Sequence, residues 1–151
     1  MNNHDLKNMD ISGEYHIEVP FFDLDPMHIV WHGNYVKYYE EARCAVLRNI
    51  DYDYPQMKHS GFYWPIIDIR LKYIKPAKYG QKLRCTATLV EFENRLKIEY
   101  LIEDSETGNK LSKGYSIQVA VTTDDFEMQL MSPTILKQKL EAYRDQSIIE
   151  K

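Results

Sequence analysis

The chain has 151 residues, a formal net charge of −4, and hydrophobic and charged fractions of 44% and 28%. This length suits one globular domain with a real core and is too short for two. The acidic balance argues against a nucleic-acid-binding protein, whose surface usually carries a basic excess. No apolar run approaches the roughly 20 residues of a membrane-spanning helix, and residues 1–13 lack the apolar segment of a signal peptide. We therefore expect a cytoplasmic protein without a membrane span.

The first 13 residues are polar and are expected to form a flexible arm ahead of a single domain at residues 14–146. From Glu14 to Phe22 apolar and polar side chains alternate, which is the period of a half-buried strand. Pro20 indicates that this strand ends there or lies at a sheet edge. The two cysteines, Cys44 and Cys85, are too few for a disulfide framework and are expected to be reduced, packed thiols.

A long helix is predicted from Tyr35 to Asn49, because its apolar residues recur at three- and four-residue spacing along one face. We expect this face to pack in the core and Asn34 to be the N-cap. The apolar face consists of Tyr35, Tyr38, Tyr39, Ala42, Ala45 and Val46. A stretch with Pro55 and Gly61 follows and favours a turn or a short second helix.

Four long strands are predicted after this stretch, at residues 63–75, 82–93, 95–105 and 110–123. Short links rich in turn residues separate them, so neighbouring strands should pair antiparallel. Pro133 fits the first turn of a C-terminal helix. A strand, a long helix and four antiparallel strands predict an α+β protein, in which one sheet wraps around one helix.

The loop between the first strand and the long helix, Asp23-Leu-Asp-Pro-Met-His-Ile-Val-Trp-His-Gly-Asn-Tyr35, contains two carboxylates and two imidazoles. It leads into a helix start, where backbone N–H groups are unpaired and the helix dipole is positive. A carboxylate there can attack a carbonyl, or activate water against it, while the N–H groups stabilise the oxyanion. The alternative for Asp25 is that it only caps the turn before Pro26.

This loop, together with Tyr38-Tyr-Glu-Glu-Ala-Arg43, resembles the 4-hydroxybenzoyl-CoA thioesterase family of hotdog-fold acyl-CoA thioesterases. The resemblance extends from about Glu14 to Thr123. It implies a hotdog fold, with an antiparallel sheet of about five strands wrapped around one long helix. It also implies hydrolysis of an aliphatic or aromatic thioester of coenzyme A or acyl carrier protein, without a cofactor. The implied assembly is a homodimer with a continuous sheet, often paired into a homotetramer.

The resemblance assigns Asp25 as the catalytic carboxylate, acting either as nucleophile or as general base. It assigns the backbone N–H of His32 as an oxyanion donor. The His32 side chain either takes part in catalysis or is structural. Asp23 is expected to hold the loop through hydrogen bonds to backbone amides. His28 is a departure, since relatives commonly have a small Gly there; it could narrow the pocket, alter acyl preference or point to solvent.

Four further residues are candidate substrate contacts. Gly33 lets the backbone come close to the substrate. Asn34 is expected chiefly to cap the helix and only secondarily to contact the substrate. Trp31, with the aromatic residues at 62–64, could line an acyl tunnel, or belong to the core or a subunit interface. Lys75 lies in a basic stretch, residues 70–78, that could contact the phosphates of coenzyme A or form a solvated sheet face.

The sequence also allows a metal site and two other functions as alternatives. His28, His32 and Asp25 include ligand types that bind zinc or iron, but Pro26 disfavours the helical geometry that the two histidines would need, so we expect no metal. A hotdog hydratase or dehydratase would need a His and a carboxylate aimed at the α and β carbons of an acyl thioester. A non-catalytic protein that binds acyl thioesters is the third possibility.

Overall fold

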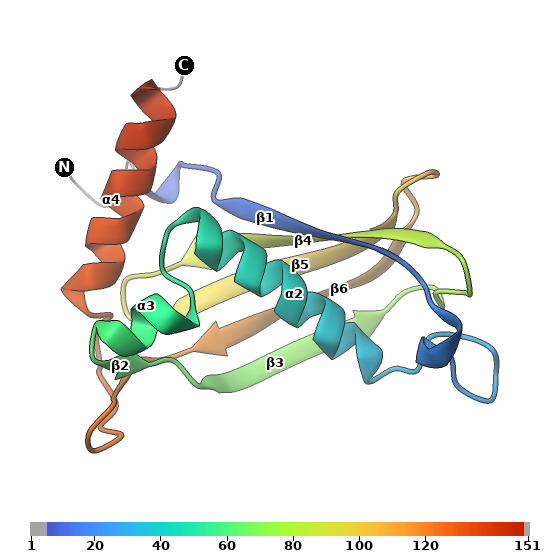
Figure 1. The fold of residues 1–151 in the computed structure, drawn as a ribbon, viewed down its shortest axis with the longest axis horizontal. Coiled ribbons are helices and arrows are strands. Elements are labelled where there is room, and N and C mark those ends of the chain that lie inside the picture. Colours follow the sequence, from blue (N-terminus) through green and yellow to red (C-terminus); the bar gives the residue numbers. More distant parts are fainter. Residues whose placement is uncertain (1–5, 150–151) are drawn as a thin grey trace.

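The computed structural model describes residues 6–149 and has a five-stranded antiparallel sheet with the order β1-β4-β5-β6-β3. The strands are β1 (Ser12–Glu18), β3 (Ile66–Tyr73), β4 (Lys82–Glu91), β5 (Leu96–Asp104) and β6 (Lys110–Gln118). The long helix α2 (Asn34–Asn49) lies across one face of this sheet (Figure 1). The α+β arrangement predicted from the sequence, one long helix on a sheet of about five strands, is confirmed.

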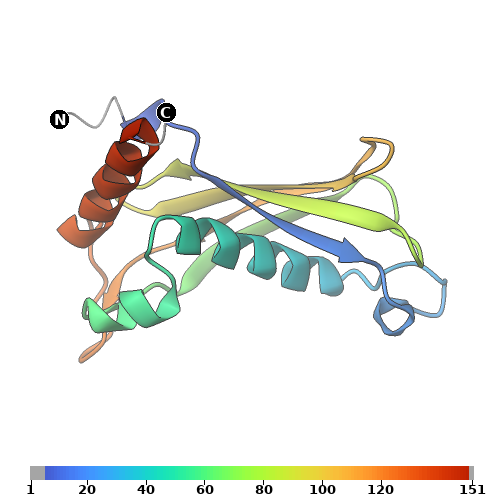
Figure 2. The same cartoon turned by 45° about the horizontal axis from the view of Figure 1, so that its top comes forward.

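Smaller elements close the two ends of this layer. A 3-10 turn, η1 (Phe21–Asp23), follows β1, and the short helix α3 (Tyr54–His59) follows α2. The expected strands at 63–75 and 110–123 are each broken, because β2 (Phe62–Tyr63) and β7 (Val121–Thr122) leave the main sheet and pair with each other. The C-terminal helix α4 (Thr134–Ile149) is present as predicted, but it begins directly after Pro133, so Pro133 precedes its first turn. Figure 2 shows α3 and α4 at the end opposite to the loop that precedes α2.

The apolar face of α2 forms the core with the inner side of the sheet. Tyr39 of α2 stacks on Tyr100 of β5 with ring centroids 4.4 Å apart, and its hydroxyl meets the Ser112 hydroxyl at 2.6 Å. Gly13 lets β1 approach the helix, since a Cβ there would lie 2.3 Å from the backbone nitrogen of Val46. The helix therefore packs chiefly on β1 and β4, and the opposite edge strand, β3, keeps Ile69 40% exposed.

The expected N-terminal arm is described only from residue 6 onward. Leu6 and Ile11 are each 1% exposed and belong to the core, and Ser12 begins β1. These residues of the arm are thus packed on the domain, while residues 1–5 lie outside the described part. Cys44 and Cys85 form no disulfide, and Cys85 is buried. Among residues 6–149, no helix combines the length and the apolar character needed to cross a membrane.

Candidate active site

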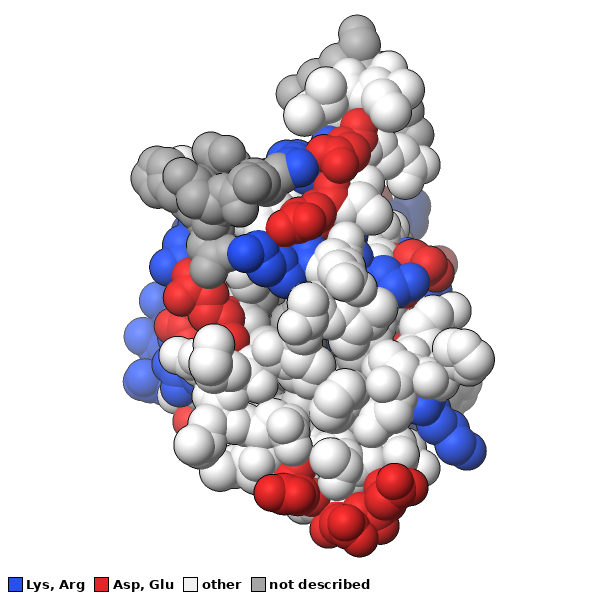
Figure 3. Space-filling model, turned by 90° about the vertical axis from the view of Figure 1, so that its left-hand side faces the viewer, with Lys and Arg blue, Asp and Glu red and all other residues white. Residues whose placement is uncertain are grey.

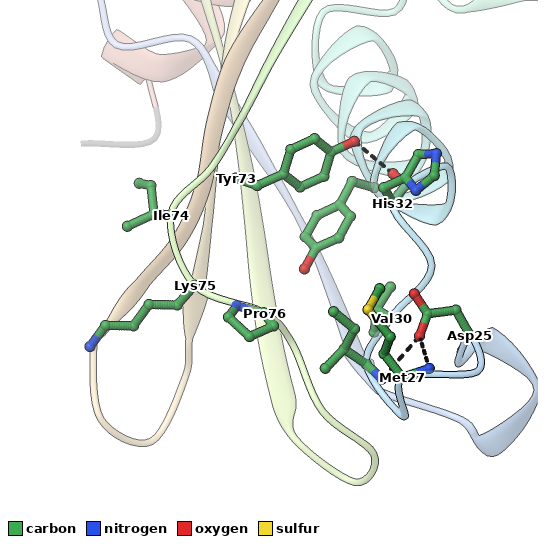
Figure 4. A pocket seen from close by; sticks show the side chains of 10 residues that line it. Asp25, Met27, Val30, His32, Tyr73, Ile74, Lys75 and Pro76 are labelled. Carbon is green, nitrogen blue, oxygen red and sulfur yellow. Dashed lines mark hydrogen bonds between the residues drawn. The ribbon is translucent and has the colours of Figure 1, made fainter.

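The loop that precedes α2 is held as a small hairpin by its own backbone and by Asp25. The Asp25 amide donates to the Ile29 carbonyl at 2.8 Å. The Asp25 carboxylate oxygen Oδ1 accepts from the Met27 amide at 2.8 Å and from the Ile29 amide at 3.5 Å. Oδ2 has no hydrogen-bond partner among the described residues, and Figure 4 shows it turned away from these amides, on the side where His32 lies. One carboxylate oxygen therefore holds the loop while the other is free for chemistry.

Asp23 holds the loop against the helix. It is 9% exposed, and its Oδ2 accepts from the Tyr38 hydroxyl at 2.5 Å. Its backbone carbonyl accepts from the Trp31 amide and from Nδ2 of Asn34, each at 2.9 Å. The structural role expected for Asp23 is confirmed, but its carboxylate binds a phenol rather than backbone amides. Burial, followed by the bond to Asp23, raises the pKa of Tyr38 far above its ordinary value.

The start of α2 differs from the predicted cap. Gly33 is the N-cap and Asn34 is already helical, so Asn34 does not cap the helix. Its amide side chain turns back to Asp23, because the buried Asp23 carbonyl needs a donor. The backbone N–H of Asn34 donates to the Trp31 carbonyl. The backbone N–H groups of His32 and Gly33 have no partner within the described part of the chain. The helix thus begins with two N–H groups available to an anion.

Tyr73 fixes this helix start from the opposite side of the fold. Its hydroxyl donates to the His32 carbonyl at 2.8 Å, from the last residue of β3. Its ring meets the Tyr35 ring edge-on, with centroids 5.0 Å apart. The Tyr35 hydroxyl in turn accepts from the Ala77 amide at 3.1 Å. The end of β3, the loop after it and the first turn of α2 are therefore one connected unit.

A cavity of about 270 Å³ opens between these segments. Its walls are mostly apolar, with the Asp25 carboxylate and the His32 residue on one side and Lys75 on the other (Figure 4). The lining residues are Asp25, Met27, Ile29, Val30, His32, Tyr35, Tyr73, Ile74, Lys75 and Pro76. We call it the Asp25 pocket. Of the six residues predicted for the site, it brings together Asp25, His32 and Lys75.

The other three predicted residues support the site without lining it. Trp31 is 49% exposed and lies against the His32 ring, with centroids 5.1 Å apart. Gly33 leaves room for that indole, since a Cβ at Gly33 would lie 2.3 Å from the Trp31 ring. Asn34 is 6% exposed and bound to the Asp23 carbonyl. The contacts expected of them with a substrate are therefore not made from within this pocket.

Sequence reasoning did not assign Tyr73 and Tyr35 to the site. Tyr35 belongs to the apolar face of α2, and the same position also reaches the pocket because it lies in the first turn. Tyr73 lies within the stretch that was predicted as a strand, and strand composition alone does not indicate a site. Its contact with His32 spans 41 residues and requires the sheet to be placed.

His28 does not narrow the pocket. It is exposed and does not line the Asp25 pocket, so of the three options it points to solvent. Its φ of 64° is left-handed, a conformation that glycine adopts without strain. This left-handed backbone explains why a Gly is expected at this position in the family that the loop resembles. Within residues 6–149, no group of three or more His, Cys, Asp or Glu side chains is placed to hold a metal ion.

Comparisons with known proteins agree with this geometry. The family model described as "Thioesterase superfamily" matches residues 27–109. A Bacillus subtilis protein named "Putative acyl-CoA thioesterase YneP" is 31% identical over 112 residues, which cover 74% of this chain and 80% of that protein. A DHNA-CoA thioesterase from Staphylococcus aureus has the same fold, with a TM-score of 0.76 at 22% identity over 92% of this chain and 93% of that one. A 4-hydroxybenzoyl-CoA thioesterase mutant bound to 4-hydroxybenzoyl-CoA gives 0.75 at 16% identity, over 86% and 99% of the two chains.

Proposed function

Since this chain belongs to the thioesterase superfamily and is a thioester hydrolase with the hotdog fold, we propose that it hydrolyses acyl-CoA thioesters in the Asp25 pocket. The observation that carries this proposal is a free oxygen of the Asp25 carboxylate at an apolar pocket that His32 also lines, with the unpaired backbone amides of His32 and Gly33 at the adjacent helix start. The carboxylate supplies a base or nucleophile, and the amides receive the negative charge that forms on the thioester oxygen. The products are a free acid and a thiol.

Asp25 acts through its Oδ2 oxygen in either of two ways. As a nucleophile it attacks the thioester carbonyl, the C–S bond breaks, and water then cleaves the mixed anhydride. As a general base it takes a proton from a water that attacks the carbonyl directly. The thiolate is a good leaving group, so neither route depends on a strong general acid.

The His32 amide is the proposed oxyanion donor, with the Gly33 amide beside it. One such donor typically lowers the barrier by about 3–4 kcal/mol, or roughly 10²–10³ in rate. The support is that both amides stand at the positive end of α2 and lack a partner among the described residues. Since the donor is backbone, the His32 side chain serves at most to orient water or substrate at the pocket rim.

Lys75 is the proposed contact for a phosphate of coenzyme A. It lines the pocket mouth and its side chain is exposed. An ammonium group there attracts a phosphate without a glycine-rich loop. Acyl carrier protein is the other carrier that this mouth could serve, and its phosphopantetheine arm presents the same thioester. We further propose that the enzyme is a cytoplasmic homodimer, which the two free cysteines and the unpaired edge of β3 support.

The test measures release of free thiol from acetyl-, octanoyl-, palmitoyl- and benzoyl-CoA, and from the matching acyl carrier protein thioesters. We expect turnover of at least one acyl-CoA by the wild type and a loss of roughly 10²–10³ in rate for Asp25→Asn. Asp145→Asn is the matched control, since this exposed carboxylate lies on α4 and pairs with Arg144. A wild type that is inert on every thioester, or an Asp25→Asn variant with near-full activity, would overturn the proposal.

A further inference from the structure

A second cavity adjoins the Asp25 pocket, at the end of the molecule that carries the loop before α2 (Figure 1). Its volume is about 490 Å³, and it shares Lys75 and Pro76 with the Asp25 pocket. The other lining residues are Lys78, Tyr79, Gly80, Gln81, Asn109 and Leu111. We call it the Tyr79 cavity. A ligand whose reactive end lies against Asp25 therefore reaches this second space by crossing Lys75 and Pro76.

The turn at residues 76–81, which forms one wall of the Tyr79 cavity, is held by its own hydrogen bonds. The Lys78 amide donates to Oε1 of Gln81 at 3.0 Å, and the Gln81 amide donates to the Lys78 carbonyl at 3.1 Å. Gly80 has a φ of 78°, a left-handed conformation that favours glycine. Lys78 also forms a backbone bridge with Ile29, in the hairpin that contains the proposed reacting carboxylate. Lys78 and Tyr79 therefore project from a fixed backbone beside the Asp25 pocket.

Two lysines give the Tyr79 cavity a positive charge. Lys75 and Lys78 are exposed, and neither forms an ion pair within residues 6–149. Figure 4 shows the Lys75 side chain extended away from Asp25, so its ammonium group lies outside the space where a thioester would react. Unpaired ammonium groups on a rigid turn favour a ligand with phosphate groups, because charge-assisted hydrogen bonds to phosphate are strong.

The carboxylates nearest to these lysines are already engaged with other groups. Glu106 pairs with Lys82 at 3.6 Å. One carboxylate oxygen of Asp104 accepts from Nε2 of Gln81 at 2.8 Å, and the other accepts from the backbone amides of the next turn. These bonds hold the pKa of Asp104 below its usual value. The charge of Lys75 and Lys78 is therefore left for a ligand.

The Tyr79 ring offers a flat surface to an aromatic ligand. It is 66% exposed, and the Phe21 ring lies perpendicular to it with centroids 6.4 Å apart, which limits how the Tyr79 ring turns. Nucleobases stack on exposed aromatic rings of this kind. Asn109 lies on the β5–β6 hairpin across the cavity, and its exposed amide side chain presents a donor and an acceptor to the edge of a base. Lysines beside a stacking surface are suited to a nucleotide.

The opposite end of the molecule does not suit a nucleotide. A cavity of about 490 Å³ there has Trp64 and Phe126 among its walls, and Lys58 is the one exposed cation among its lining residues. Its guanidinium, Arg43, is 3% exposed and is bound to Glu40 of the same helix. Figure 3 shows this end as a broad face without charged side chains, with acidic side chains along one border. Phosphate groups are therefore better accommodated in the Tyr79 cavity.

We infer that the Tyr79 cavity binds the 3′-phosphorylated adenosine diphosphate of coenzyme A, with Lys75 and Lys78 on its phosphate groups and Tyr79 stacked on its adenine. This inference rests on the proposed function, because the thioester of the same ligand must lie against Asp25. It makes coenzyme A the preferred carrier, since the phosphopantetheine arm of acyl carrier protein has no nucleotide. A free adenosine nucleotide has the same chemistry, and the experiment separates the two sources.

Three thioesters of one acyl group test this inference: the CoA thioester, the pantetheine thioester and the acyl carrier protein thioester. We expect the wild type to have a kcat/KM about tenfold or more higher for acyl-CoA than for acyl-pantetheine, through a lower KM. The ratio of these two kcat/KM values should fall about tenfold in Lys78→Ala and in Tyr79→Ala. Melting curves show whether each variant is folded, and the ratio itself is insensitive to a loss of active protein.

Binding of adenosine 3′,5′-bisphosphate, measured by calorimetry, tests the cavity without turnover. We expect this nucleotide to compete with acyl-CoA and to bind Lys78→Ala about tenfold more weakly than the wild type. If it instead changes kcat for acyl-pantetheine without competing with acyl-CoA, the cavity is a regulatory site for a free nucleotide and the inference is wrong.

Lys113→Ala is the matched control for general attraction between lysines and phosphate. Lys113 is an exposed residue of β6 and lines a separate hollow that shares no residue with the Asp25 pocket. We expect it to keep the wild-type ratio of acyl-CoA to acyl-pantetheine. An equal fall of this ratio in Lys113→Ala and Lys78→Ala would overturn the inference, because the attraction would then not depend on the Tyr79 cavity.

Failure of this inference differs from failure of the proposed function. Equal kcat/KM values for acyl-CoA and acyl-pantetheine, or a preference for acyl carrier protein, overturn the inference while hydrolysis at Asp25 stands. A wild type that is inert on all three thioesters but binds adenosine 3′,5′-bisphosphate through Lys78 overturns the proposed function, and with it the assignment of this nucleotide to a substrate.

Discussion

The Tyr73 hydroxyl donates a hydrogen bond of 2.8 Å to the His32 carbonyl, so the end of β3 holds the peptide between His32 and Gly33 at the start of α2. Tyr73→Phe keeps the edge-on contact with Tyr35 and removes only the hydroxyl. We expect kcat to fall several-fold because the peptide between His32 and Gly33, whose N–H is the second proposed oxyanion donor, loses its orientation, while the free energy of unfolding changes by about 0.5–1.5 kcal/mol. Steady-state kinetics and chemical denaturation measure the two effects. Asp145→Asn, the control variant on α4, should change neither.

The Tyr38–Asp23 bond is a stability element. Tyr38→Phe leaves the Asp23 carboxylate buried without its hydroxyl donor, and an unsatisfied buried group of this kind costs about 1–3 kcal/mol. We expect the midpoint of urea unfolding to fall at neutral pH. The double variant Tyr38→Phe with Asp23→Asn serves as control, because removing the charge should recover part of the loss. A Tyr38→Phe protein as stable as the wild type would contradict the role given to Asp23.

Buried tyrosines should make the protein sensitive to alkali. Burial raises the pKa of Tyr38 and Tyr39 far above their usual value and that of Tyr100 to about 12. Below pH 10 both the folded and the unfolded state keep these phenols protonated, so their contribution to stability is complete. Above about pH 10 the unfolded state loses protons first, and the free energy of unfolding falls as pH rises. The part of the tyrosinate absorbance that comes from these buried residues should therefore appear in step with loss of circular dichroism, whereas ionisation of all tyrosines before the fold is lost would disprove the burial.

The left-handed backbone of His28 predicts opposite results for two substitutions. His28→Val should destabilise the fold by about 1–2 kcal/mol, because a β-branched residue tolerates this conformation poorly. His28→Gly should leave stability unchanged or slightly higher and should keep full thioesterase activity, since the side chain is exposed and outside the Asp25 pocket. Thermal unfolding and thiol release check both. Loss of activity in His28→Gly would show that this imidazole reaches the substrate.

Regular patterns were sufficient to predict the main fold. The apolar spacing in α2 and the alternation in β1, β4 and β5 follow directly from burial on one face. The breaks at the ends of β3 and β6 were not predicted, because Phe62–Tyr63 and Val121–Thr122 have strand composition and only the tertiary structure separates them from the main sheet. The burial of Leu6 depends on a contact surface that is absent from the local sequence.

Site residues that lie in one short segment could be predicted from the sequence. Site residues that depend on packing between distant segments could not. Asp25 and His32 lie in one loop, so a single motif identified both. Asn34 has the composition of a cap, but the buried carbonyl of Asp23 competes successfully for its side chain. Tyr73 could not be assigned, because its bond to His32 requires the end of β3 to lie beside the helix start.

The most direct test of the central claim separates binding from turnover in Asp25→Asn. Isothermal titration calorimetry with an acyl-CoA that the wild type hydrolyses measures the Kd of the variant. Single-turnover thiol release from the same complex then measures its rate. The account predicts a Kd within a few-fold of the wild-type KM and a rate reduced by roughly 10²–10³. An Asp25→Asn protein that releases thiol at the wild-type rate would contradict the assignment of Asp25 as the reacting carboxylate.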